Sequence, residues 1–194
     1  MARAAAYNFD HHTSVADFTV PKHAYLAARS DASFGYIATS ALVLDTTTAS
    51  GPRVLLLQRA ASDEDPNKWE PPGGACDDED PSILNAAARE LWEEAGLIVA
   101  QIGGVIGTPH FFTLEDGKRV CQFNFVMQVE NDAGTPPAVR LDPNEHQQYV
   151  WATENEVKIK EVGDINLDFT REEVRQTVLL VFDYYRETMA KEKT

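Results

Sequence analysis

The stretch that decides the fold is Arg89-Glu90-Leu91-Trp92-Glu93-Glu94-Ala95-Gly96-Leu97, with Pro72-Gly73-Gly74 upstream of it. If the stretch is helical, Glu90, Glu93 and Glu94 stand at positions i, i+3 and i+4, within one arc of about 100°. Mg²⁺ prefers oxygen ligands and keeps several waters, so a few carboxylates and the phosphate oxygens of a substrate complete its coordination. The pattern therefore predicts magnesium-dependent phosphate chemistry.

The alternative interpretation is an ordinary solvated helix face, which most runs of acidic residues form. The helical projection argues against it, because Glu94 falls beside an apolar stripe that contains Leu84 and Leu91. A carboxylate next to the core needs a partner or a cation. Arg89 stands four residues before Glu93 and can hold it, and because such a pair adds only a few tenths of a kcal/mol we expect its role to be orientation.

The flanking residues predict where the helix begins and ends. Asp80 is a good N-cap, Pro81 suits the first helical position, and Gly96 suits the left-handed residue that ends a helix. We therefore expect a helix over residues 81–95. Upstream, Gly73-Gly74 follows two prolines, and such a loop can bring bare backbone close to a ligand.

The segment from Asn67 to Leu97 resembles the Nudix box of Nudix hydrolases. That pattern is a glycine, five residues, a glutamate, seven residues and then Arg-Glu-aliphatic-x-Glu-Glu-x-Gly-aliphatic, and its second half matches residues 89–97 at every fixed position. The resemblance implies a loop-helix-loop that binds Mg²⁺ or Mn²⁺. The residues that it assigns to the metal are the carboxylates of Glu90, Glu93 and Glu94 and the carbonyl of Gly73.

The first half of the box departs from the pattern. Five residues separate Gly74 from Asp80, which stands where the family has glutamate, and eight residues, not seven, separate Asp80 from Arg89. This is a one-residue extension, with Glu79 or Asp80 as the substitute acid. In the family that first acid mainly supports the arginine and the loop, so the departure bears on geometry more than on metal binding.

Length and composition predict one soluble domain. The chain has 194 residues, of which 43% are hydrophobic and 25% charged. We interpret residues 1–30 as an N-terminal extension and residues 31–194 as a single domain that includes a long C-terminal helix. No apolar run approaches the roughly 20 residues that span a bilayer, and the N-terminus does not have the pattern of a secretory signal. The expected location is cytoplasmic, without a membrane partner.

Charge and cysteine content narrow the partners. A net charge of -14 repels the phosphate backbone, so a nucleic acid polymer is not expected as a partner. Cys76 and Cys121 have neither zinc-site spacing nor a disulfide framework, which fits a reducing compartment. The expected partner is a small-molecule diphosphate, and the sequence leaves a homodimer open.

Alternating and aliphatic runs predict strands around the acidic helix. A mixture of strands with few helices indicates an α/β or α+β layered domain, and the resemblance sharpens this to an α/β/α sandwich around a mixed sheet. Two capping boxes, Thr153-x-x-Glu156 and Thr170-x-x-Glu173, predict a short helix and a long terminal one to about Ala190. A turn-to-helix segment is expected at 21–26, and the expected strands are 34–44, 53–58, 98–107, 119–129 and 149–152.

The resemblance implies metal-assisted hydrolysis of a diphosphate linkage. Family members draw the base from the box or from a late loop, so Glu94 is the first candidate and Glu145 the second. Glu93 and Arg89 complete the predicted catalytic set. His146 adjoins Glu145 and is expected to be a surface side chain.

A chain this acidic needs local positive groups for a diphosphate. Arg59 follows the second predicted strand and Lys68 precedes Trp69, where the family often recruits substrate contacts, so both are candidates for substrate binding. His110 and Phe112 are further candidates.

Aromatic residues near these positions leave the substrate open. Phe111, Phe112 and Tyr149 fit either a core or a pocket that stacks on a base or holds an apolar tail. The residues do not decide between a nucleotide and a prenyl diphosphate.

Two other classes also stay open. A binding or regulatory module that kept the fold and lost catalysis would fit the altered first acid, whereas the intact Glu90, Glu93 and Glu94 speak against it. Diphosphate isomerisation, another branch of the superfamily, relies on a cysteine in the early strands, where neither Cys76 nor Cys121 lies.

Overall fold

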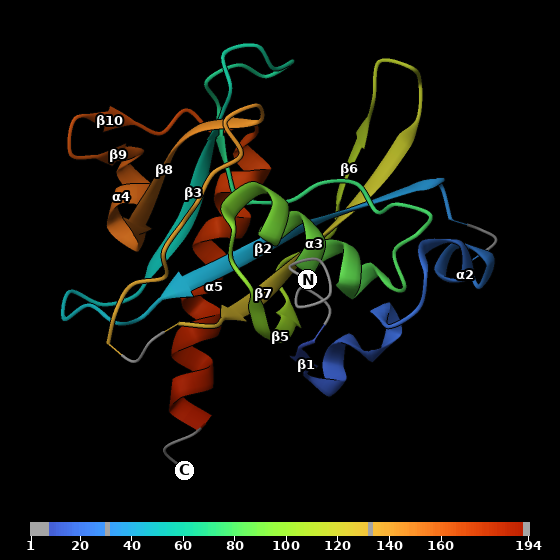
Figure 1. Cartoon of the computed structure of the whole chain (residues 1–194), viewed down its shortest axis with the longest axis horizontal. Coiled ribbons are helices and arrows are strands. Elements are labelled where there is room, and N and C mark those ends of the chain that lie inside the picture. Colours follow the sequence, from blue (N-terminus) through green and yellow to red (C-terminus); the bar gives the residue numbers. More distant parts are fainter. Residues whose placement is uncertain (1–7, 30–31, 132–133, 192–194) are drawn as a thin grey trace.

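A mixed sheet of eight strands lies between helix α3 (Ile83–Ala95) on one face and helix α5 (Glu172–Lys191) on the other (Figure 1). The computed structural model describes residues 8–29, 32–131 and 134–191. The sheet strands are β1 (Asp10–His11), β2 (Tyr36–Asp45), β3 (Arg53–Arg59), β4 (Trp69–Glu70), β5 (Val99–Val105), β6 (His110–Thr113), β7 (Arg119–Val129) and β8 (His146–Thr153). The smaller elements are a 3₁₀ helix η1 (Thr13–Phe18), helices α2 (Lys22–Ala27) and α4 (Glu154–Ile159), and a hairpin of β9 (Glu161–Val162) and β10 (Ile165–Asn166).

The strand order is β1-β5-β7-β2-β3-β4, with β6 also on β7 and β8 also on β3. β2 and β7 run parallel at the centre, from Tyr36 opposite Val120 to Val43 opposite Met127. β1 is parallel to β5, and the other pairs in the sheet are antiparallel. The predicted α/β/α sandwich around a mixed sheet is confirmed.

The two central antiparallel neighbours separate, and a loop fills the opening. β2 and β3 pair only at Leu44 with Val54 and Asp45 with Arg53. Nearer its start, at residues 37–41, β2 pairs with the loop 72–76 instead of β3. The bonds that join them run from Thr39 N to Gly74 O at 2.8 Å, from Ala41 N to Pro72 O at 2.8 Å and from Cys76 N to Ile37 O at 2.9 Å. The Gly-Gly loop is therefore fixed to the sheet by backbone hydrogen bonds.

Each face of the sheet has its own apolar core. On one face, α3 buries residues such as Leu84 and Leu91 against side chains that include Ala41 of β2 and Phe125 of β7. On the other face, α5 buries Val178, Val181 and Phe182 in the core that contains Leu42 and Val126. Alternate residues of one strand thus serve opposite cores, as strand geometry requires.

The described part of the N-terminal segment packs on the α3 side. β1 adds a strand to the edge at β5, and Phe18 and Tyr25 lie in the core beside Phe123. The predicted helix at 21–26 is present as α2. Residues 1–7 and 30–31 lie outside the described part of the chain, so the boundary at residue 30 stays a prediction.

Most other predicted elements are present. Strand β6 was not predicted, and it pairs with β7 across a turn that Leu114, Gly117 and Lys118 close by backbone hydrogen bonds. The Thr153 capping box is confirmed, because Glu156 N and Thr153 N each bond to the other residue's side chain. The Thr170 box is wrong, since α5 begins at Glu172 and Arg171 therefore holds the cap position. In the described residues no helix has the length and apolarity to cross a membrane.

Candidate metal and diphosphate site

Helix α3 begins two residues later than predicted. Its N-cap is Ser82, whose hydroxyl accepts from Asn85 N at 3.1 Å, so the prediction of Asp80 as the cap and Pro81 as the first helical residue is wrong. Gly96 ends the helix as predicted, with φ 67° in the left-handed region. The shift of the cap frees Asp80 for another partner.

Arg89 is the centre of the loop and helix. Its side chain is only 5% exposed, and it binds Asp80 with both Nε and Nη2, at 3.0 and 2.9 Å. Its Nη1 donates to Glu90 at 2.8 Å and to Glu93 at 2.9 Å. Nη2 also donates to Ala75 O at 2.9 Å. One guanidinium therefore joins the extended loop to two of the predicted metal-binding carboxylates, with Asp80 as the supporting acid.

The glycine pair is explained by close approach. A Cβ on Gly73 would lie 2.2 Å from Thr39 O, and a Cβ on Gly74 would lie 2.7 Å from the carboxylate of Glu90. Gly73 has no room for a side chain because fixed backbone lies there, and a side chain at Gly74 would displace the Glu90 carboxylate. Gly73 N donates to Glu94 Oε2 at 2.8 Å and so fixes this carboxylate. Glu94 is 94% buried, as the prediction that it lies beside the core requires.

The carboxylates raise one another's proton affinity. Burial raises the pKa of Glu90 to about 7 against the pull of Arg89, and burial raises the pKa of Glu94 well above its ordinary value, with Glu90, Glu70 and Glu145 adding to it. The pKa of Glu70 is also raised by burial. Such a cluster binds protons or a cation in place of the water it has lost.

Glu145 reaches this cluster through a backbone clasp on α3. Arg140 N donates to Ala95 O at 2.8 Å and Asp142 N to Glu94 O at 3.3 Å, so the segment before β8 runs along the end of the helix. Burial, reinforced by Asp142, raises the pKa of Glu145. The second candidate base therefore lies beside the first, from a part of the chain that sequence distance alone would not bring there.

His146 is buried, so its prediction as a surface side chain is wrong. It is 4% exposed, and burial, with Arg59 adding, lowers its pKa to about 4. One of its ring nitrogens and one carboxylate oxygen each from Glu94 and Glu145 lie within 4.8 Å of one another. The signal that the sequence offered was adjacency to Glu145.

The residues present fit a divalent cation. Glu90, Glu93 and Glu94 lie on one face of α3 as predicted, and Gly73 and Glu145 lie beside them. Hard oxygen donors at the edge of a buried acidic cluster are the donor set that Mg²⁺ and Mn²⁺ take. Burial raises the pKa of Glu90 and of Glu94, so a divalent cation at this cluster would favour the charged form of both carboxylates.

Of the predicted substrate cations, Arg59 lies near the acids and Lys68 does not contact them. Arg59 forms ion pairs with Asp63 and Glu70, so it borders the cluster from β3. Lys68 pairs with Asp168 at 2.6 Å, in the segment before α5. The structure thus places only the first of the two beside the carboxylates.

His110 and Phe112 lie on the other face of the sheet. His110 Nε2 shares a hydrogen bond of 2.8 Å with Thr177 Oγ1 of α5, and the guanidinium of Arg171 lies 4.5 Å from the centre of the Phe112 ring. Phe111 and Tyr149 are 51% and 41% exposed, so neither is a core residue.

A small polar hollow of about 10 Å³ lies on this face and has Glu70 of the acidic cluster in its lining. It is lined by Ser40, Glu70, Pro71, His110, Gln122, Asn124, Val174 and Thr177. Asn124 Nδ2 in it has no hydrogen-bond partner among the described residues, whereas the Gln122 side chain lies within reach of the His110 ring. Glu70 and the nearby Arg171, whose charge acts on both Glu70 and His110, were not among the predicted site residues. Nothing in the local pattern shows that β4 and the segment before α5 meet, as the bridge between Trp69 and Phe169 joins them.

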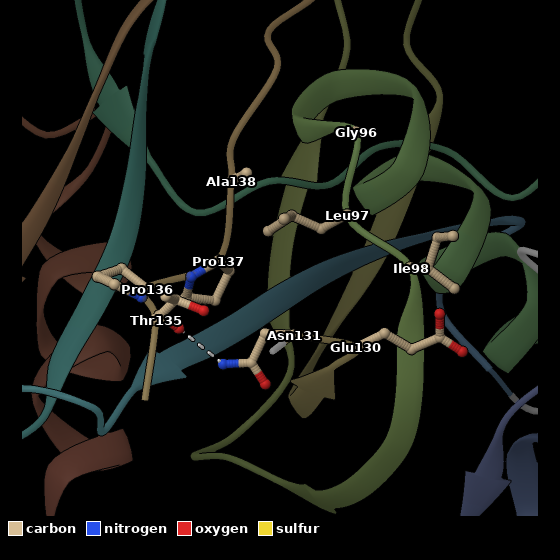
Figure 2. A pocket seen from close by; sticks show the side chains of 9 residues that line it. All are labelled: Gly96, Leu97, Ile98, Glu130, Asn131, Thr135, Pro136, Pro137 and Ala138. Carbon is tan, nitrogen blue, oxygen red and sulfur yellow. Dashed lines mark hydrogen bonds between the residues drawn. The ribbon is translucent and has the colours of Figure 1, made fainter. Parts of the chain in front are cut away.

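Two larger hollows flank the end of α3. One of about 440 Å³ is lined by residues 96–98, 130–131 and 135–138 (Figure 2), and none of the predicted site residues lines it. Another of about 310 Å³ is lined by Trp92, Glu93, Arg140, Leu141, Asp142 and Pro143. The second opens beside a predicted metal ligand and is therefore the one that relates to the candidate site.

Comparisons with known proteins agree with this geometry. A family model described as NUDIX domain matches residues 36–172. Among solved structures, the MutT protein from Methanosarcina mazei Go1 is 27% identical, with a TM-score of 0.55 over 78% of this chain and 94% of that one. Among curated proteins no relative matches.

Two further solved structures show the same fold at lower identity. An Ap4A hydrolase from C. elegans, solved as a binary complex, is 24% identical, with a TM-score of 0.57 over 79% of this chain and 99% of that one. The NUDIX domain of Shewanella oneidensis NrtR, solved with ADP ribose, is 17% identical, with a TM-score of 0.58 over 84% and 97%.

Proposed function

The chain belongs to the NUDIX-domain family of pyrophosphohydrolases, and on this premise we propose that it uses Mg²⁺ or Mn²⁺ to hydrolyse a diphosphate linkage in a nucleoside diphosphate derivative or another small organic diphosphate. The observation that carries the proposal is that Glu90 and Glu93 both bind Arg89, while Glu94 on the same helix binds the backbone N–H of Gly73. That is the donor set a hard cation and a diphosphate need together.

Each residue of the site has a role that its contacts support. Glu90, Glu93, Glu94 and the Gly73 carbonyl would hold the ion, and Arg89 fixes the first two carboxylates at 2.8 and 2.9 Å. When bound, a divalent ion neutralises diphosphate charge and lowers the pKa of a coordinated water.

Glu94 and Glu145 are the candidate bases, and we assign the proton to the pair. Their carboxylate oxygens lie within 4.8 Å of each other, and burial raises the pKa of each. Two carboxylates this close titrate as a unit. Glu145 is the exposed member and can meet a water from solvent, while Glu94 is held by Gly73 N.

The small polar hollow beside Glu70 holds neither a base nor a prenyl chain, because its volume is about 10 Å³, which is room for about one water. The preference for a nucleoside derivative is therefore drawn from two of the similar structures. One is named as an Ap4A hydrolase, and the other was solved with ADP ribose.

The alternatives receive less support. Asp80 holds Arg89 through two hydrogen bonds, so the altered first acid still supplies the support that a catalytic box needs. For isomerisation, burial raises the pKa of Cys76 to about 12 and that of Cys121 to about 11, which leaves no reactive thiolate at neutral pH. Three points stay predictions. They are a cytoplasmic location, the lack of a nucleic acid or membrane partner, and the oligomeric state, for which a homodimer is left open.

The test is a substrate panel with paired variants. Nucleoside diphosphate sugars, dinucleoside polyphosphates, oxidised nucleotides and prenyl diphosphates are offered with Mg²⁺ or Mn²⁺, and phosphate release is measured after phosphatase treatment. We expect Glu93→Gln and Glu94→Gln each to lower kcat by at least about a hundredfold, because the loss falls on charge stabilisation in the transition state. Glu187→Gln, an identical charge change on the exposed face of α5, should keep the parent rate. Full activity in both site variants would refute the assignment.

A further inference from the structure

His146 stands where a metal ligand would stand, and the resemblance assigns it no role. A ring nitrogen of His146 lies within 4.8 Å of a carboxylate oxygen of Glu94 and of one of Glu145, a spacing that one ion can bridge. The side chain is 96% buried, and its Nδ1 has no hydrogen-bond partner among the described residues. Buried polar atoms in folded proteins are almost always paired, so this nitrogen calls for an explanation.

The surroundings of His146 supply acceptors and few donors. Glu94 accepts from Gly73 N, and no side-chain hydrogen bond to Glu145 is present in the described residues. The nearby cation Arg59 is directed to Asp63 and Glu70. Two carboxylates and an imidazole that crowd together without a shared donor are stabilised by a cation that accepts their lone pairs.

A break in strand register brings the imidazole there. β8 pairs with β3 as Gln58 with Gln148 and then Arg59 with His146, so Gln147 is skipped. Further along β8, Val150 and Ala152 face the α5 core, and regular alternation would put His146 on that same side. The skipped residue turns His146 to the α3 face, where Glu94 lies. Bulges of this kind commonly re-aim a side chain at a site.

The backbone on the other side of His146 is also fixed. His146 N donates to Asp142 O at 2.9 Å, and Ala60 N donates to Glu145 O at 2.8 Å. Both ligating residues are therefore held by the main chain and not by their side chains. Preorganisation of this kind is typical of ligands and leaves their donor atoms free.

We propose that Glu94, Glu145 and His146 form a mixed nitrogen and oxygen site for a divalent first-row transition ion, such as Co²⁺ or Mn²⁺, within the metal centre of the proposed function. The inference rests on that function in placing an ion at the acidic cluster, and it goes beyond it in the identity of the third ligand. An imidazole nitrogen strengthens the binding of Co²⁺ or Zn²⁺ far more than that of Mg²⁺, which prefers oxygen. The chain should therefore discriminate between these ions through one residue.

The experiment compares ion binding in the full-length parent, His146→Gln and His23→Gln, all stripped of metal. His23 is exposed on α2 and serves as the matched control. Calorimetric titrations with Co²⁺ and with Mg²⁺ give the two dissociation constants. We expect His146→Gln to raise the Kd for Co²⁺ by at least about tenfold and that for Mg²⁺ by less than about threefold, with both unchanged in His23→Gln.

A second readout needs no variant. Pulsed electron paramagnetic resonance of the Mn²⁺-loaded parent should show ¹⁴N coupling from a directly bound imidazole, so the inference stays testable even if His146→Gln does not fold. Absence of that coupling, or an unchanged Co²⁺ affinity in a folded His146→Gln variant, overturns the site. Nitrogen coupling in a chain that hydrolyses no diphosphate would support the His146 site and overturn the proposed function. Hydrolysis with Mg²⁺ but no nitrogen coupling would support the proposed function and overturn the His146 site.

Discussion

Removing the Arg89 guanidinium should destabilise the fold more than removing the guanidinium of an exposed arginine. Arg89→Met keeps much of the aliphatic volume and deletes the group that binds Asp80, Glu90 and Glu93. Asp80 is left as a carboxylate with a side chain 4% exposed, and the carbonyl of Ala75 loses its donor. The cost comes from charges that remain buried without a partner.

The magnitude follows from that burial. Breaking a buried ion pair by removing one partner costs about 3–5 kcal/mol, whereas exposed pairs contribute about 0–1 kcal/mol. We therefore expect Arg89→Met to lower the free energy of unfolding by about 3 kcal/mol or more. Arg186→Met, whose guanidinium is 53% exposed and pairs with Glu154 and Asp183, should leave the free energy of unfolding close to that of the parent.

The assay is urea unfolding followed by circular dichroism, in the presence of a chelator. A bound cation would neutralise Glu90 and Glu93 and hide part of the loss, so metal must be absent. Adding Asp80→Asn to Arg89→Met should recover about 1–3 kcal/mol of the loss expected from the two single changes, because the pair interacts directly. Equal losses in Arg89→Met and Arg186→Met, or strict additivity with Asp80→Asn, would refute the reasoning.

Three other predictions follow from single contacts. Gly74→Ala should weaken Mg²⁺ binding at least about tenfold in calorimetry, because the new Cβ would lie 2.7 Å from the Glu90 carboxylate; unchanged affinity would contradict the packing argument. The pKa of Glu90 is about 7 in the folded chain against 4.5 as its ordinary value, so the native state keeps a proton that the unfolded chain releases. The free energy of unfolding of the metal-free parent should therefore fall relative to that of Glu90→Gln as the pH rises from about 4.5 to about 7, by up to about 3 kcal/mol. Urea unfolding at pH 5 and pH 8 measures this, and the same difference between parent and variant at both pH values would contradict it. Lys22→Met should lower the unfolding free energy by about 1 kcal/mol, since Lys22 holds the loop through Cys76 O at 2.6 Å and Asp78 at 3.0 Å, and a value within error of the parent would show that α2 does not anchor the loop.

The acidic helix was predictable because its signal is local. Helical periodicity alone places Glu90, Glu93 and Glu94 on one face and Glu94 beside the core, and the structure has both features. Gly96 as the end of α3 and the Thr153 capping box also depend only on neighbouring residues, and both are confirmed.

The start of α3 shows where local reasoning fails. Asp80 has the side chain of a good N-cap, but the buried Arg89, further along α3, donates two charge-assisted hydrogen bonds to it. Ser82 then caps the helix, and Pro81 lies ahead of it. A tertiary ion pair thus outweighed a capping preference of about 1 kcal/mol.

The sequence by itself determined the combination of strands with few helices and the acidic face of α3, because side-chain periodicity and turn residues act over a few positions. The mixed sheet was expected from the family resemblance. Only the tertiary structure decided which distant residues join that face. Glu70, Glu145 and His146 arrive there through the loop pairing with β2, the clasp on α3 and the skipped residue in β8. These depend on strand register and on which chain segments fill a gap in the sheet, and register is set by the packing of both faces at once.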